Sequence, residues 1–193
     1  LAAPLAAVTD RSDLPAQLER NPHAKIGVGL ARDNQVTLRH DWTAEAFPWH
    51  STALAVHLVR FFSIALGAGT VIAIYHVARL TAPGQPTIHL TAVLLAAFNP
   101  MFLFITASVN NDNLVNLLSA AALAQVLALW RGGLTARRVL ALAVTLALAS
   151  LSKLSGLALY PVAALVVLLV VRREGSAQRR DAATRGRRPP MAI

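Results

Sequence analysis

Long apolar stretches, separated by short polar or basic segments, follow one another from residue 51 to residue 171. Each of the first three is roughly 18 residues long, near the minimum with which an α-helix crosses a hydrocarbon core of about 30 Å. Residues 1–50 contain no such stretch and show neither a clear helical period nor a clear strand period. The pattern predicts an all-α, polytopic transmembrane bundle, preceded by a water-exposed region with short elements.

Capping and helix-breaking residues mark the bounds of the first two spans. Ser51 is suited to cap a helix over Thr52–Leu80. The dipeptide Asn99-Pro100 interrupts the second apolar stretch. Because a proline removes one backbone donor and kinks a helix, we expect a bend in the second span.

The last apolar stretch, residues 139–171, is too long for one upright crossing, since a helix of that length would measure about 50 Å. Lys153 lies in its middle, where a lone ammonium costs about 3 kcal/mol. A break at Ser152–Gly156 removes both difficulties. We therefore expect five spans, near residues 61–78, 90–107, 114–130, 139–152 and 156–171.

Composition supports a membrane protein. Only 14% of the residues are charged and 55% are apolar, whereas soluble domains have about 25% charged residues. The chain has no cysteine, so disulfides, thiol nucleophiles and thiolate metal sites are excluded.

The charge distribution predicts an orientation. Most of the net charge of +9 lies in the loop 131–138 and in the tail 172–193, beside hydrophobic segments. This is the positive-inside pattern, and it argues against a nucleic-acid partner. With five spans, residues 1–50 are expected outside as an extracytoplasmic loop region. The tail is expected to be a disordered cytoplasmic anchor at an anionic leaflet.

Polar side chains at the predicted outer ends of the spans are the candidates for binding chemistry, because the chain has no P-loop, GxGxxG, HExxH or GxSxG motif. The densest group consists of Asn110, Asn111, Asp112 and Asn113. It is either a solvated turn in which Asp112 or Asn113 caps the next helix, or a site for a sugar or a metal-bridged phosphate. Lys153 is either a snorkelling lysine or a cation for a lipid phosphate.

Weaker candidates lie nearer the N-terminus. Arg60 shares a helical face with His50 and His57, and its guanidinium suits either lipid headgroups or bidentate phosphate binding. The histidines have no acidic or thiol partner at a spacing that favours a metal site. Three carboxylates could act in acid/base chemistry but are more simply interpreted as surface charges: Asp33, Asp41 and Glu45.

Several segments, taken in their order and spacing along the chain, carry a resemblance to a known family. They are Asn21–Gly27, Asp33-Asn34, Arg60–Gly67 with Val71–Arg79, Asn99–Asn113, and Ser150–Pro161. Together they resemble bacterial polytopic glycosyltransferases, namely the dolichyl-phosphate-mannose–protein-mannosyltransferase-like proteins of the GT-C fold. The resemblance extends from about residue 20 to residue 172.

The resemblance implies an enzyme that transfers a sugar from a polyprenyl-phosphate donor to a lipid, glycan or protein on the extracytoplasmic side. In such enzymes an acidic residue just after the first span acts as base or binds a metal, and neither that span nor that residue is in this sequence. We therefore interpret the chain as a fragment that is inactive alone, with its catalytic residue upstream. Arg60 or Lys153 would hold the donor phosphate, and Asp112 would orient the sugar or a divalent metal.

Other functions stay open from the sequence. The chain could be a transporter or scaffold subunit without chemistry, or an inactive relative that binds a lipid-linked sugar. The expected partners are the lipid-linked sugar and membrane lipids, and the expected location is a bacterial inner membrane. The sugar, the acceptor, the metal requirement and the oligomeric state are not determined by the sequence.

Overall fold

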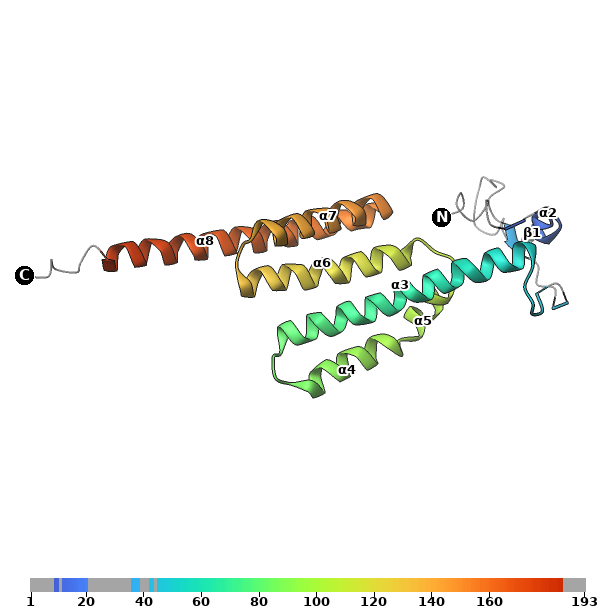
Figure 1. Cartoon of the computed structure of the whole chain (residues 1–193), viewed down its shortest axis with the longest axis horizontal. Coiled ribbons are helices and arrows are strands. Elements are labelled where there is room, and N and C mark those ends of the chain that lie inside the picture. The colour runs from blue at the N-terminus through green and yellow to red at the C-terminus, as the bar shows by residue number, and fades with distance from the viewer. Residues whose placement is uncertain (1–8, 11, 21–35, 39–41, 44, 186–193) are drawn as a thin grey trace, which may run out of the picture. The chain divides into compact units, whose positions relative to one another are not determined.

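The computed structural model describes residues 9–10, 12–20, 36–38, 42–43 and 45–185 (Figure 1). The candidate carboxylates Asp33 and Asp41 lie outside these residues. The chain divides into two compact units, Leu1–Phe62 and Ser63–Ile193, and each is considered by itself.

The first unit contains short elements, in keeping with its mixed sequence. These are helix α2 (Leu14–Gln17), strand β1 (Leu18–Arg20) and strand β2 (Val36–Leu38). The two strands pair in antiparallel register, with Leu18 opposite Leu38.

Helix α3 (Ser51–Thr81) begins in the first unit, one residue before the predicted start. The Asp13 carboxylate accepts hydrogen bonds from the backbone N–H of Thr52 at 3.2 Å and from its hydroxyl at 2.6 Å. A carboxylate at this position satisfies a free N–H of the first turn and favours the positive end of the helix. The start of α3 is thus fixed by a side chain that is distant in sequence.

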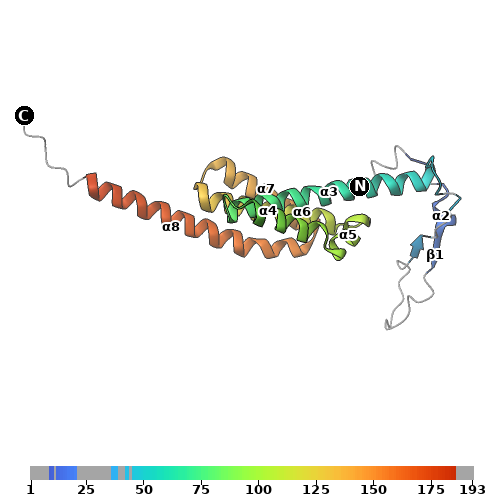
Figure 2. The ribbon, with the colours of Figure 1, turned by 90° about the horizontal axis from the view of Figure 1, so that it is seen from below.

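All elements of the second unit are helical within its described residues. Its elements are α3 from Ser63 onward, α4 (Pro86–Ala97), α5 (Pro100–Ala107), α6 (Asp112–Gly132), α7 (Ala136–Ser152), the 3₁₀ turn η1 (Leu154–Ala158) and α8 (Leu159–Arg185). Helices α6 and α7 lie side by side, and α8 continues beyond their ends (Figures 1 and 2). The predicted all-α fold class is confirmed.

The core of this unit lies between α6, α7 and α8. Its buried members recur at helical spacing: Ala122, Val126 and Leu129 on α6, Leu142 and Leu146 on α7, and Ala163 on α8. Alanines at these positions allow the helix axes to approach closely, as is common between membrane helices.

Glycines allow α3 to approach its neighbours. A Cβ atom added at Gly67 would lie 2.6 Å from the Thr106 methyl carbon on α5, and one at Gly69 would lie 3.1 Å from a Leu117 methyl carbon on α6. Small residues therefore form these contacts of α3 as well.

The second apolar stretch is bent at the predicted place. Helices α4 and α5 meet at 58° around Asn99-Pro100. The Asn99 side chain accepts hydrogen bonds from the backbone N–H of Met101 at 2.9 Å and of Phe102 at 3.2 Å. The asparagine caps α5, and the proline occupies the first helical position, where its missing N–H has no consequence.

The last apolar stretch is broken at the predicted place too. Helix α7 ends at Ser152, and Lys153 has extended backbone angles (φ −161°, ψ 141°). A Cβ atom on Gly156 would lie 2.5 Å from the Ala149 carbonyl carbon and oxygen, so this close turn requires glycine. The break separates α7 from η1 and α8.

Two expectations for the basic segments are wrong. The tail beginning at residue 172 is helical through Arg185, because most of its residues are Arg, Ala, Gln and Glu, which are good helix formers, and Gly175 weakens the run most. Residues 186–193 lie outside the described part. The loop 131–138 is shortened to residues 133–135, since α6 continues through Gly132 and α7 starts at Ala136.

Fewer helices than expected have the length of a membrane span. Three are long and apolar enough, namely Ser51–Thr81, Asp112–Gly132 and Leu154–Gln178, and the bent pair α4–α5 would make a fourth. Helix α7 has 17 residues, fewer than the roughly 20 of a typical span. By length and composition the structure has three or four candidate spans, while α7, at the lower limit of span length, packs along α6 and returns to Asp112 at Lys153.

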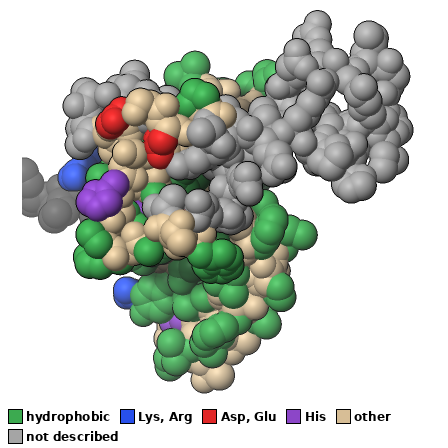
Figure 3. Space-filling model, turned by 90° about the vertical axis from the view of Figure 1, so that its right-hand side faces the viewer, with side chains coloured by type: hydrophobic (Ala, Val, Ile, Leu, Met, Phe, Trp, Pro, Cys, Tyr) green, Lys and Arg blue, Asp and Glu red, His purple; other side chains and the backbone are tan. Residues whose placement is uncertain are grey.

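The surface of these helices is apolar. Only 22%, 28% and 17% of the residues in their most apolar windows are buried. Large side chains such as Leu95, Phe98 and Phe104 are exposed. On the face seen in Figure 3, hydrophobic side chains cover much of the described surface, and few charges interrupt them. Exposed apolar area of this extent is typical of a surface that contacts lipid.

Candidate functional site

The polar segment that precedes and begins α6 forms one end of the second unit. Asn111 occupies the N-cap position, but its side chain makes no capping hydrogen bond. Instead, Asn110 Oδ1 accepts a hydrogen bond from the backbone N–H of Asp112 at 2.9 Å. The expected capping by Asp112 or Asn113 is wrong, because the helix begins at Asp112 and both residues lie inside its first turn.

Lys153 contacts Asp112 across the bundle. Its Nζ donates a hydrogen bond to Asp112 Oδ1, and the two form an ion pair over 41 residues of sequence. The Lys153 side chain is 43% exposed and that of Asp112 is 29% exposed. Because both side chains are partly exposed, a ligand can reach them. Screening by solvent limits the stabilisation from such a pair to about 1 kcal/mol or less.

Asn113 has a different environment from the rest of the segment. It is 1% exposed, and its Nδ2 donates to the Ser108 carbonyl oxygen at 3.1 Å. Its Oδ1 accepts no hydrogen bond within the described residues. Asn113 therefore belongs to the interior behind the candidate site, whereas Asn110, Asn111 and Asp112 keep some exposure.

Two hydroxyl groups near Lys153 were not predicted as site residues. Ser150 Oγ donates to the Tyr160 hydroxyl at 3.3 Å, joining the last turn of α7 to the start of α8. Both residues lie in the Ser150–Pro161 segment, and this position is the sequence feature from which they could have been predicted as site residues. They support the backbone on either side of the Lys153 break.

The remaining candidates lie in the first unit. Arg60 is half-buried on α3, and its part in a phosphate site stays a prediction. The His57 ring stacks on Trp49 with 4.0 Å between ring centroids, and its Nδ1–H donates to the Ala53 carbonyl oxygen at 2.8 Å. His57 thus serves local packing in this unit.

The described residues offer no complete ligand set for a metal ion. No three His, Cys, Asp or Glu side chains gather there. Asp112, the predicted ligand, has an ammonium as its partner. A metal at Asp112 would need ligands from outside this part of the chain.

Comparison with known families shows that the region containing this site matches a family model. The family model described as "Predicted membrane protein (DUF2142)" matches residues 42–187. The chain belongs to the DUF2142 family. No curated protein and no solved structure matches it.

The DUF2142 region includes both partners of the Asp112–Lys153 contact and all of the helices from α3 to α8. Its long apolar helices fit an integral membrane protein, which the sequence also predicts.

Proposed function

We propose that this DUF2142 chain is part of an integral-membrane glycosyltransferase. The enzyme takes a sugar from a polyprenyl-phosphate donor and transfers it to a lipid, glycan or protein on the extracytoplasmic side. The observation that carries the proposal is the contact between the Lys153 ammonium and the Asp112 carboxylate, beside the amides of Asn110 and Asn111. A sugar phosphate presents an anion and several hydroxyls, and these groups complement a cation, a carboxylate and amides.

The ion pair suggests how the donor is recognised. In the absence of donor, Lys153 and Asp112 neutralise each other. A donor phosphate that contacts Lys153 replaces the carboxylate as partner of the ammonium. The Asp112 carboxylate is then able to accept hydrogen bonds from sugar hydroxyls, which are neutral donors. In the absence of ligand, each charged group thus stabilises the other. A ligand that presents both a phosphate and sugar hydroxyls replaces this contact.

The surroundings of Lys153 suit a lipid-linked donor. Leu151 and Leu154, on either side of it, are 84% and 80% exposed. A cation between exposed leucines lies at the boundary between hydrocarbon and headgroups. A polyprenyl phosphate has the same arrangement, with an apolar chain attached directly to an anion.

Charge supports the orientation of this site. Arg131, Arg137 and Arg138 lie at the end of α6 and α7 away from Asp112 and Lys153. Arginine clusters resist translocation, which favours a cytoplasmic position for that end and an extracytoplasmic position for the site. Arg60 is proposed to bind the donor phosphate as well.

The test is a transfer assay with the full-length membrane protein in proteoliposomes and radiolabelled polyprenyl-phosphate hexoses. Lys153→Ala and Asp112→Ala should each lower transfer roughly tenfold or more, the effect of losing a charge-assisted hydrogen bond worth about 1.5–3 kcal/mol. Lys153→Arg should retain part of the activity, because it retains the charge.

Arg137→Ala is the matched control, since it removes an exposed cation at the other end of the bundle. Its transfer rate should equal that of the unaltered protein. The proposal is overturned by full transfer in the Lys153 and Asp112 variants, by an equal loss in Arg137→Ala, or by an unaltered protein that transfers none of the hexoses.

A further inference from the structure

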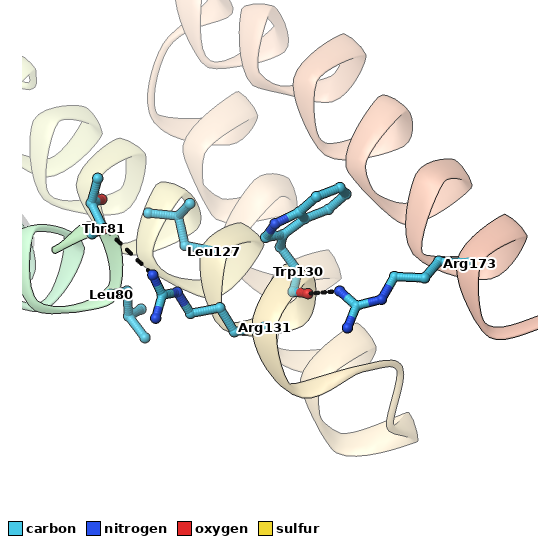
Figure 4. A pocket seen from close by; sticks show the side chains of 6 residues that line it. All are labelled: Leu80, Thr81, Leu127, Trp130, Arg131 and Arg173. Atoms are coloured by element: carbon cyan, nitrogen blue, oxygen red, sulfur yellow. Dashed lines mark hydrogen bonds between the residues drawn. The ribbon is translucent and has the colours of Figure 1, made fainter. Parts of the chain in front are cut away.

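A second polar site lies at the far end of α6 from Asp112. A cavity of about 400 Å³ is lined by Leu80, Thr81, Leu127, Trp130, Arg131 and Arg173 (Figure 4). These residues come from the end of α3, the last turns of α6 and the middle of α8. The lining combines three large apolar side chains with two guanidinium groups.

Each guanidinium is positioned by one backbone carbonyl. Arg131 Nη2 donates to the Thr81 oxygen at 3.4 Å, and Arg173 Nη1 donates to the Trp130 oxygen at 3.3 Å. The two side chains lie on opposite sides of Trp130 in Figure 4. Both contacts are long, and a guanidinium has five N–H donors, so most of the hydrogen-bonding capacity of each group is left for a ligand.

No carboxylate among the described residues forms an ion pair with either arginine. Glu174, the acidic neighbour of Arg173, instead accepts a hydrogen bond from the backbone N–H of Leu134 at 2.9 Å. The cavity therefore has two positive charges that no described side chain neutralises.

The depth of the cavity matches a lipid headgroup region. Arg131 follows Asp112 by 19 positions on one helix, a rise of about 28 Å, close to the thickness of a hydrocarbon core. Trp130 is 42% exposed at the same level, as expected for an aromatic side chain at a membrane interface. The two ends of α6 thus reach opposite headgroup layers.

We propose that this cavity binds the phosphodiester headgroup of an anionic phospholipid. Both Arg131 and Arg173 line the cavity, and a guanidinium is able to bind a phosphate through paired N–H groups. The start of the acyl chains packs on Leu80, Leu127 and Trp130. Free inorganic phosphate has the same anionic chemistry, but the apolar lining residues and the interfacial depth favour the lipid.

The test measures lipid bound to the full-length protein by native mass spectrometry, with phosphatidylglycerol and phosphatidylcholine as probes. Replacing both lining arginines, Arg131→Ala with Arg173→Ala, should weaken phosphatidylglycerol binding roughly tenfold or more, because two charge-assisted contacts are lost. Replacing both by lysine should give an intermediate loss, since lysine binds phosphate only as a point charge.

The matched control is Arg137→Ala with Arg172→Ala, which removes the same charge from two exposed arginines outside the cavity lining. Phosphatidylglycerol binding by this control should change less than about twofold, as for charges screened by solvent. Phosphatidylcholine should bind weakly to every variant, and millimolar inorganic phosphate should not displace phosphatidylglycerol.

Three results would overturn the proposal. An equal loss in both double-alanine variants would show attraction by net charge alone. Unchanged binding in the lining variants would limit Arg131 and Arg173 to stabilising the ends of α3 and α6, whose carbonyl oxygens they contact. Displacement of phosphatidylglycerol by inorganic phosphate would identify the free anion as the ligand. The lysine variants retain a positive charge near the ends of α3 and α6. A loss of lipid binding in these variants is therefore separable from a loss caused by unfolding.

Discussion

The ammonium of Lys153 lies against the carboxylate of Asp112, and this contact connects the break after α7 to the first turn of α6. The contact exists because α6 and α7 pack side by side and because the backbone turns at Lys153.

Charge reversal tests this contact. Asp112→Lys places two ammonium groups together and should lower the free energy of unfolding by about 1 kcal/mol. Adding Lys153→Asp should restore most of that loss, because the pair is re-formed with opposite polarity. Thermal unfolding in detergent measures both. Adding Arg137→Asp instead should restore nothing, and equal recovery from this distant change would contradict a specific pair.

The turn at Gly156 leads to a second prediction. Gly156→Ala should destabilise the protein by about 1–3 kcal/mol, because the new methyl group meets the Ala149 backbone, which cannot rotate away. Gly175→Ala is the control, since no atom lies within 4 Å of its added Cβ. Within a helix this change should stabilise by about 0.5–1 kcal/mol. Unfolding midpoints that move in the same direction for both variants would contradict the described turn.

A polar contact between α6 and α7 gives a third prediction. Gln125 Nε2 donates to Thr145 Oγ1 at 3.0 Å, while Gln125 Oε1 is buried with no hydrogen-bond partner in the described part of the chain. Thr145→Val should cost about 1–3 kcal/mol, because it leaves the whole Gln125 amide unpaired. Gln125→Leu removes the unpaired oxygen as well and should be nearly neutral. Urea or thermal unfolding of the two variants measures the difference, and a larger loss for Gln125→Leu would be the contrary result.

Orientation in the membrane is testable because the chain has no cysteine. Ser155→Cys lies beside Lys153, and Thr135→Cys lies in the turn between α6 and α7. Since arginines cluster around the second position, a membrane-impermeant thiol reagent should label intact cells at position 155 and should label position 135 only after permeabilisation. The opposite pattern would place the Asp112–Lys153 site in the cytoplasm.

The breaks in the apolar stretches could be predicted from single residues. Pro100 removes a backbone donor, and Lys153 cannot stay unpaired in hydrocarbon, so each disturbs a helix through its own chemistry. The partner of Lys153 could not be chosen in the same way. That choice depends on which helices pack together, and hydrophobic stretches of similar composition do not specify it.

Two errors have a common cause. The arginines after residue 171 indicate a polar segment, but polarity does not distinguish a helix that leaves the membrane from an unstructured tail. Helix α8 therefore continues where a disordered anchor was expected. The cavity between Arg131 and Arg173 was missed for the same reason, because both residues were interpreted only as contributions to the charge distribution.

Donor binding at equilibrium tests the central claim most directly, because it does not depend on the acceptor or on the catalytic base. We expect the full-length protein in detergent to bind a polyprenyl-phosphate hexose, with the dissociation constant raised about tenfold by Lys153→Ala and less by Lys153→Arg. Arg137→Ala should bind like the unaltered protein. Equal affinity in Lys153→Ala and the unaltered protein, measured by titration calorimetry, would contradict a donor site at the Asp112–Lys153 contact.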